Sequence, residues 1–243
     1  MIGASRTWPP FPGCLWARAG PDPKLGLKRK GLDLTKEVLY TSIDVGTSKI
    51  CTLVSKLNSE GSVELLGVGM SSSLGLKKGI VVNIEEARES IRASMDEAAR
   101  ASLTNNHQAV IGVTGTHLEM STRWGMTKSP FYNVPLTSEA IRQSIESARP
   151  QDLPPERQVL HLIPQAYSVD GLKGVRNPIG MHALRLDVET LCIVGATTPM
   201  QSLIHAVESS RIEAKSLVMS GIAAGEACLN RDEKEMGVVL IDI

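Results

Sequence analysis

The chain has 243 residues, of which 42% are hydrophobic, enough for one large domain or two small ones. Lys plus Arg (26) equals Asp plus Glu (26), so no net charge draws the chain to nucleic acid or to an acidic membrane. Aromatic residues, at 3%, are too few for a surface that stacks single-stranded nucleic acid, and no run of about 18 apolar residues could span a bilayer.

Residues 1–36 differ in composition from everything that follows. They combine prolines and glycines with the basic run Lys28–Lys30 and lack a sustained helix or strand period. This pattern predicts a disordered N-terminal extension, or sequence that precedes the true start of translation.

Strand patterns begin at Glu37. Three β-rich runs joined by short turns predict an antiparallel meander; they cover 38–44, 50–54 and 63–69. A helix follows, with Asn83 as its N-cap and apolar residues at helical spacing as far as Ala98. A buried strand at 109–113 completes a β-β-β-α-β unit.

Residues 117–190 are more polar and more broken, and we interpret them as a small inserted α+β subdomain. The patterns predict one helix, capped by Thr137, and three strands, at 138–148, 159–163, 166–169 and 184–188. His117 and His161 lie beside apolar residues near strand ends, so we expect them to pack or cap rather than to catalyse.

The last section returns to an α/β pattern. It predicts a buried strand at 191–195, a helix capped by Thr198 with Pro199 at its first position, and a second helix over about 223–230. We expect a solvated loop at 232–235 and a strand at 237–243. Because a natural end inside a buried strand would leave backbone groups unpaired, we expect a truncated chain.

One segment, Ile43–Ile50, carries a chemical signal. It places Asp44 at the end of a strand, followed by Gly46, Thr47, Ser48 and Lys49. Glycine lets the backbone approach a phosphate closely, three successive amides can converge on an anion, and the hydroxyls add donors. The same residues are also compatible with an ordinary tight hairpin, so the segment alone leaves both readings open.

In its context, this Asp-x-Gly-Thr-x-Lys turn resembles the first phosphate loop of the actin, sugar kinase and Hsp70 superfamily. Residues 238–243 resemble the strand and the first residue, Asp242, of the second phosphate loop. The resemblance implies that ATP binds to Asp44, Gly46–Lys49 and Asp242. It also implies Mg²⁺ held by Asp44 through water, since Mg²⁺ gives up its hydration reluctantly.

Further segments resemble FtsA, the actin-like protein of bacterial cell division; they are 74–83, 113–117, 157–170, 177–181 and 223–237. The implied fold class is α/β. An actin-like (ribonuclease H-like) domain, at 37–116 and 191–243, carries an inserted FtsA-type α+β assembly subdomain at 117–190. The chain would then be an N-terminal fragment truncated at the second phosphate loop.

The resemblance also implies a function. FtsA tethers the FtsZ ring to the cytoplasmic face of the membrane at the division site, self-associates into filaments, and contacts later division proteins through the subdomain at 117–190. Its contacts with FtsZ and the membrane lie in a second half and in a C-terminal amphipathic helix, which are absent from this sequence.

The resemblance implies ATP binding as an assembly switch, with slow hydrolysis or none. The reason is that Ser220 stands where superfamily ATPases often carry an acid or amide that orients water. Two alternatives remain: a phosphotransferase of the sugar or acetate kinase type, and an Hsp70-like ATPase. A kinase would need a base beside an acceptor pocket, and no His or Asp constellation of that kind stands out.

Overall fold

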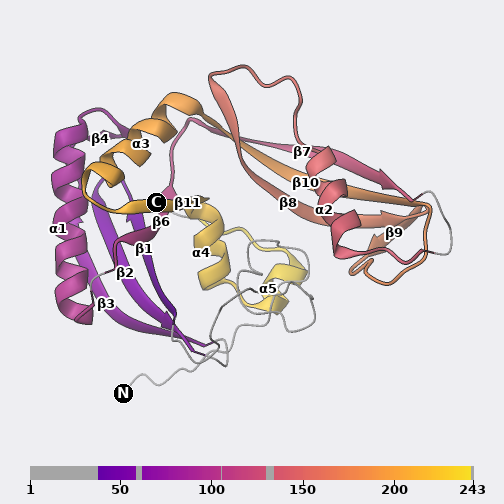
Figure 1. The fold of residues 1–243 in the computed structure, drawn as a ribbon, viewed down its shortest axis with the longest axis horizontal. Coiled ribbons are helices and arrows are strands. Elements are labelled where there is room, and N and C mark those ends of the chain that lie inside the picture. Colours follow the sequence, from indigo (N-terminus) through magenta and orange to yellow (C-terminus); the bar gives the residue numbers. More distant parts are fainter. Residues whose placement is uncertain (1–37, 59–61, 105, 130–133, 242–243) are drawn as a thin grey trace. The chain divides into compact units, whose positions relative to one another are not determined.

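The computed structural model describes residues 38–58, 62–104, 106–129 and 134–241. The predicted extension at 1–36 and Asp242 therefore lie outside the described residues. The chain divides into two compact units, one formed by 119–195 and the other by the described parts of 37–58, 63–118 and 196–243 (Figure 1). The sequence placed the corresponding insertion at 117–190.

The first unit, which contains residues 38–58, 63–118 and 196–241, is built on a five-stranded sheet in the order β11-β6-β1-β2-β3. The strands are β1 (Val38–Val45), β2 (Lys49–Leu57), β3 (Val63–Ser72), β6 (Gln108–Val113) and β11 (Glu213–Met219). Beside them stand a short hairpin and four helices: β4 (Leu76–Lys77), β5 (Ile80–Val81), α1 (Ile84–Ser102), α3 (Thr197–Ser209), α4 (Ser220–Cys228) and α5 (Arg231–Met236).

The sheet combines two kinds of pairing. Strands β1, β2 and β3 form the predicted antiparallel meander, whereas β6 lies parallel to β1 on one side and to β11 on the other. Three parallel strands therefore end side by side at one edge of the sheet. Their carboxyl ends are where loops and helix starts gather in α/β proteins, and where ligands bind.

Helix α1 covers β2 and β3 because its apolar residues recur on one face. Asn83 caps it as predicted, accepting from the amides of Glu85 and Glu86. Its buried side chains join those of α3 and of the sheet in one core, in which Ile43, Ile91 and Ile111 are fully buried. Each such side chain contributes about 1.5–3 kcal/mol through its removal from water.

The second unit is a four-stranded sheet in the order β7-β10-β8-β9 with one helix. Its elements are β7 (Leu118–Lys128), α2 (Ser138–Ser147), β8 (Arg157–Val169), β9 (Leu172–Val175) and β10 (Arg185–Ala196). It has its own core, which includes Ile145 of α2, Tyr167 of β8 and Leu186 of β10. Thr137 caps α2 as the sequence predicted, accepting from the amide of Ala140.

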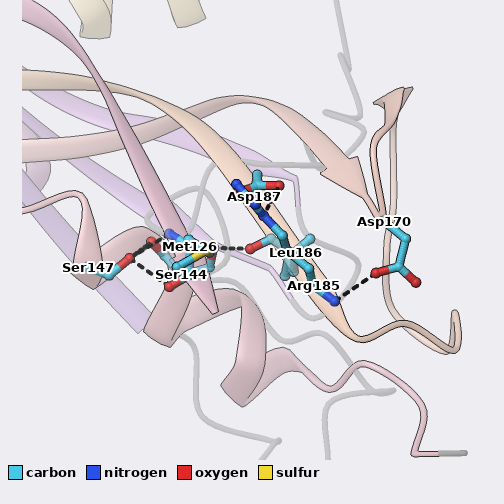
Figure 2. A network of polar contacts seen from close by, with 7 residues as sticks. All are labelled: Met126, Ser144, Ser147, Asp170, Arg185, Leu186 and Asp187. Atoms are coloured by element: carbon cyan, nitrogen blue, oxygen red, sulfur yellow. Dashed lines mark hydrogen bonds and ion pairs between the residues drawn. The ribbon is translucent and has the colours of Figure 1, made fainter. Parts of the chain in front are cut away.

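Polar contacts fix α2 and the β8–β9 turn to this sheet (Figure 2). Ser144 Oγ donates to the carbonyl of Leu186 at 3.2 Å, and Ser147 Oγ accepts from the amide of Met126 at 2.8 Å. Asp170, at the turn, accepts from the amide of Arg185 at 2.8 Å. These contacts satisfy polar groups of the second unit, so we assign them to its stability.

The structure differs from the predictions at several elements. Helix α3 begins at Thr197 with Ala196 as its N-cap and no side-chain cap, so the assignment of Thr198 as cap is wrong. The predicted loop at 232–235 lies inside α5, which has a capping box between Asn230 and Glu233. Strand β8 runs unbroken through the position of Pro164.

The predicted strand at 237–243 is not formed in its described part, residues 237–241. The side chains of Val239 and Ile241 are 87% and 74% exposed. A strand forms only where a neighbouring strand accepts and donates its backbone hydrogen bonds, and none of the described strands pairs with this segment.

Candidate functional site

The predicted loop is the tight turn between β1 and β2. The amide of Gly46 donates to the carbonyl of Lys49 at 3.1 Å and closes the turn. A Cβ at position 46 would lie 2.9 Å from that carbonyl oxygen, so the turn requires glycine there. Asp44, Thr47, Ser48 and Lys49 are all exposed around it.

This closure changes one detail of the expected anion site. The amide of Gly46 is engaged inside the hairpin, so it does not converge on a ligand together with the amides of Thr47 and Ser48, as the sequence predicted. The exposed residues Thr47–Lys49 still present backbone amides, a hydroxyl and an ammonium at one place.

Asp44 lies at the edge where the three parallel strands end. It is level with Gly112 of β6, and Gly112 is level with Val218 of β11. Ser220, the first residue of α4, donates from its Oγ to Asp44 Oδ1 at 2.8 Å. This bond joins residues 176 positions apart and holds the carboxylate in one orientation.

Gly112 makes room for this pair. A Cβ at position 112 would lie 2.6 Å from Asp44 Oδ1 and 2.9 Å from Ser220 Oγ. Neither the role of Gly112 nor the contact between Ser220 and Asp44 was predicted from the sequence. A glycine inside a strand pattern is the signal that could have found the first, because it often marks a close approach of another group. No sequence pattern indicates the contact between Ser220 and Asp44.

The β4–β5 hairpin packs against the turn. The amide of Gly79 donates to Thr47 Oγ1 at 2.9 Å, and the amide of Ser73 donates to the carbonyl of Ser48 at 3.2 Å. Residues 74–83 were singled out in the sequence only by their resemblance to FtsA. In the structure one of them, Gly79, is a direct partner of the predicted phosphate loop.

Cys51 is the direct cross-strand neighbour of Asp44. Burial raises the pKa of its thiol, the charge of Asp44 raises it further, and Lys49 opposes both. The thiol is therefore protonated at neutral pH and is a poor nucleophile, since the thiolate is the reactive form.

His117 and His161, the two histidines expected to pack or cap, are partly buried. Burial lowers the pKa of both His117 and His161. The two ring nitrogens of His117 are buried without a hydrogen-bond partner among the described residues. Each imidazole is thus held in its neutral form.

The residues present fit a phosphate ligand with its Mg²⁺. Ser220 orients the exposed carboxylate of Asp44, and the turn that begins two residues later carries donors and a cation. In the described part of the chain, no group of three or more His, Cys, Asp or Glu side chains gathers as metal ligands. A single carboxylate acting through water, together with phosphate oxygens, is the way Mg²⁺ is commonly held.

Comparison with a solved structure bears on the fold. The chain is similar in fold to a chain of the PilM-PilN type IV pilus biogenesis complex, with a TM-score of 0.51 over 78% of this chain and 50% of that one, at 14% identity. Such an identity shows the fold alone. The similarity in fold, together with the match of the inserted domain described next, confirms the predicted α/β, actin-like fold with an inserted subdomain.

Sequence comparison shows similarity to FtsA proteins. Residues 115–194 match the SHS2 domain inserted in FTSA. Proteins named cell division protein FtsA are 34% identical in Borreliella burgdorferi and 35% in Bacillus subtilis, each over 84% of this chain, and 27% identical in Escherichia coli over 86%. The predicted resemblance to FtsA is therefore confirmed. The chain spans about half the length of these relatives.

Proposed function

We propose that this chain is the nucleotide-binding and assembly portion of a cell division protein with the role of FtsA. One observation carries the proposal: an SHS2 domain of the kind inserted in FtsA interrupts an actin-like unit, between β6 and α3. The relatives that match 84% of the chain are named for cell division. A general metabolic kinase would have no reason to contain this insertion.

ATP with Mg²⁺ is the proposed ligand, bound at the turn between β1 and β2. Thr47, Ser48 and Lys49 contact its phosphates, Asp44 holds the hydrated Mg²⁺, and Asp242 contributes from the second phosphate loop. When bound, Mg²⁺ neutralises phosphate charge and orients the phosphate oxygens. The tight turn at Gly46, which brings these side chains together, supports the assignment.

The proposed ATP hydrolysis is slow or absent, so that bound nucleotide acts as an assembly switch. Ser220 stands at the start of α4, where an acid or amide would orient the attacking water. Its hydroxyl donates to Asp44. A serine oxygen is a far weaker base than a carboxylate, so Ser220 is poorly suited to take a proton from water.

The proposed partners follow from the resemblance to FtsA. They are a second copy of the protein in filaments, later division proteins at 117–190, and FtsZ and the membrane through regions outside this sequence. The protein is then cytoplasmic and peripheral on the inner face of the membrane at the division site. No helix in the described ranges is long and apolar enough to cross a bilayer.

The two alternatives predict different behaviour. A sugar or acetate kinase-like phosphotransferase transfers phosphate to a small metabolite, and an Hsp70-like ATPase binds unfolded chains. Co-sedimentation of the full-length protein with FtsZ polymers, and flotation with anionic lipid vesicles, separate these from the adaptor. We expect ATP-dependent recovery with both. A protein that ignored both and phosphorylated a small metabolite would contradict the proposal.

A further inference from the structure

We propose that Lys78, at the tip of the β4–β5 hairpin, binds the phosphate chain of the nucleotide together with the turn between β1 and β2. This inference rests on the proposed nucleotide site and adds a second element to it. The charge of Lys78 can be removed by substitution without changing the fold of the hairpin.

The backbone at Lys78 is unusual for a lysine. Lys78 and Gly79 both have positive φ, at 52° and 76°, and form the two-residue turn between β4 and β5. Two successive left-handed residues are typical of a type I′ turn, where Asn or Asp before Gly is preferred. A lysine at this position is strained relative to glycine, so the structure keeps its side chain at an energetic penalty.

The other described non-glycine residues with positive φ have local roles. Leu103 is the C-cap of α1, and Arg211 follows the C-cap of α3. Asp170 accepts from the amide of Arg185 at 2.8 Å. Lys78 is exposed, and no hydrogen bond or ion pair with a described residue engages its ammonium. No contact of the Lys78 side chain within the turn therefore accounts for its strained backbone.

The tip of the hairpin is fixed rather than free in solvent. The amide of Gly79 donates to Thr47 Oγ1 at 2.9 Å. On the other side, a Cβ at Gly79 would lie 2.3 Å from the carbonyl oxygen of Thr114, which follows β6. The hairpin tip is thus held between the proposed phosphate loop and the carboxyl end of a parallel strand, one residue away from Lys78.

The base of the hairpin is equally constrained. The amides of Val82 and Asn83 both donate to the carbonyl of Gly75, at 2.8 and 3.1 Å, and Asn83 caps α1. A lysine on such a support has a fixed Cα and a flexible four-carbon stem. Its ammonium can reach an anion bound at Thr47 without any movement of the backbone.

The charges of the region favour an anionic ligand. Lys49 and Lys78 are exposed around the turn, and no ion pair joins either of them to a carboxylate in the described parts of the chain. The nearby carboxylate, Asp44, is already engaged by Ser220. A triphosphate with its Mg²⁺ carries a net negative charge that these lysines complement.

Titration of the full-length protein with magnesium ATP and with magnesium tripolyphosphate tests the proposal. Lys78→Ala should weaken binding of both by about tenfold, because a charge-assisted contact is lost. Lys78→Arg should retain most of the affinity. Lys77→Ala is the matched control, since Lys77 is adjacent and also exposed, and it should bind as the wild type does.

Lys78→Gly separates binding from folding. Glycine relieves the left-handed strain, so the melting temperature without ligand should stay level or rise while affinity falls as in Lys78→Ala. Raising the salt concentration should weaken wild-type binding more than that of either variant.

Two results would overturn the inference: affinity unchanged in Lys78→Ala, or an equal loss in Lys77→Ala. Failure of the proposed function itself has a different signature. In that case the wild type would bind neither probe, or Asp44→Asn would bind magnesium ATP as tightly as the wild type.

Discussion

At the scale of single residues, the site depends on one contact between distant parts of the chain. Ser220 donates to Asp44 at 2.8 Å, and Gly112 leaves the space that the pair occupies. A carboxylate held in this way presents its second oxygen in a constant direction. Such preorganisation lowers the entropic cost of binding a hydrated cation, because the carboxylate is already ordered.

Removing the hydroxyl should weaken Mg²⁺-dependent binding. We expect Ser220→Ala to lower the affinity for magnesium ATP by about threefold to tenfold, since a hydrogen bond to a charged group is lost at an exposed site. Ser216→Ala, in the same strand-to-helix region and exposed, is the control. A magnesium titration at fixed ATP measures the effect, and equal curves for Ser220→Ala and wild type would show that the contact has no role in binding.

The pH dependence of stability should reflect His117. Burial lowers its pKa below the ordinary value of 6.5, so the unfolded chain binds this proton more readily than the folded one. Stability is therefore complete above that value and falls as the pH drops through it toward the lower folded pKa.

Thermal melts between about pH 7.5 and about pH 5.5 measure this slope. His117→Asn should show a shallower decrease than the wild type across the same range. Parallel curves for the two proteins would mean that another group sets the acid sensitivity.

At the scale of elements, local sequence signals predicted most of the first unit and the start of α2 in the second. The β-β-β-α-β order, the N-cap at Asn83 and the cap at Thr137 follow from periodicity and capping chemistry, which act over a few residues. Strand β11, the β4–β5 hairpin and helix α5 were not predicted from the sequence. Strand β11 is short of buried apolar residues, and a two-residue hairpin arm is too short for a period to be visible.

The site divides in the same way. Asp44 and Gly46–Lys49 are contiguous in sequence, so their turn was predictable. The contacts of Asp44 with Ser220, and of Thr47 with Gly79, depend on how β6, β11 and the small hairpin pack around that turn. No local pattern encodes such contacts, because each partner is an ordinary Ser or Gly in its own segment.

Close packing of α1 on β3 gives a prediction at this scale. A Cβ at Gly69 would lie 1.9 Å from the carbonyl oxygen of Ser94, so the helix would have to move away from the strand. We expect Gly69→Ala to destabilise the protein by roughly 1–3 kcal/mol through overpacking.

Gly225→Ala is the matched control for this substitution. It lies in α4 with no atom within 4 Å of the added methyl, and alanine is favoured there by up to about 1 kcal/mol. Denaturant unfolding compares the two variants. A Gly69→Ala protein as stable as Gly225→Ala would contradict the close contact.

At the scale of the whole molecule, the two units are separable in sequence and in core. Each has its own buried cluster, and the amide of Ala196 donates to the carbonyl of His117 at 3.2 Å, next to the points where the units divide. Chain ends that lie this close are the usual condition for a tolerated domain insertion.

Excision of the inserted unit tests this separation. We expect a variant in which 119–195 is replaced by a short Gly-Ser linker, in the full-length protein, to melt cooperatively and to bind magnesium ATP with unchanged affinity. It should lose self-association, which sedimentation velocity measures. A variant that is unfolded, or that assembles as the wild type does, would contradict the proposed division of roles.

The central claim is that the turn between β1 and β2 binds nucleotide through Asp44 and Mg²⁺. Calorimetric titration of the full-length protein with ATP, with and without EDTA, tests it most directly in wild type and Asp44→Asn. Asparagine keeps the shape and the contact with Ser220 but removes the charge. We predict that Asp44→Asn loses about tenfold in affinity with Mg²⁺ present and little in EDTA. Equal affinities with Mg²⁺, or no binding by the wild type, would contradict it.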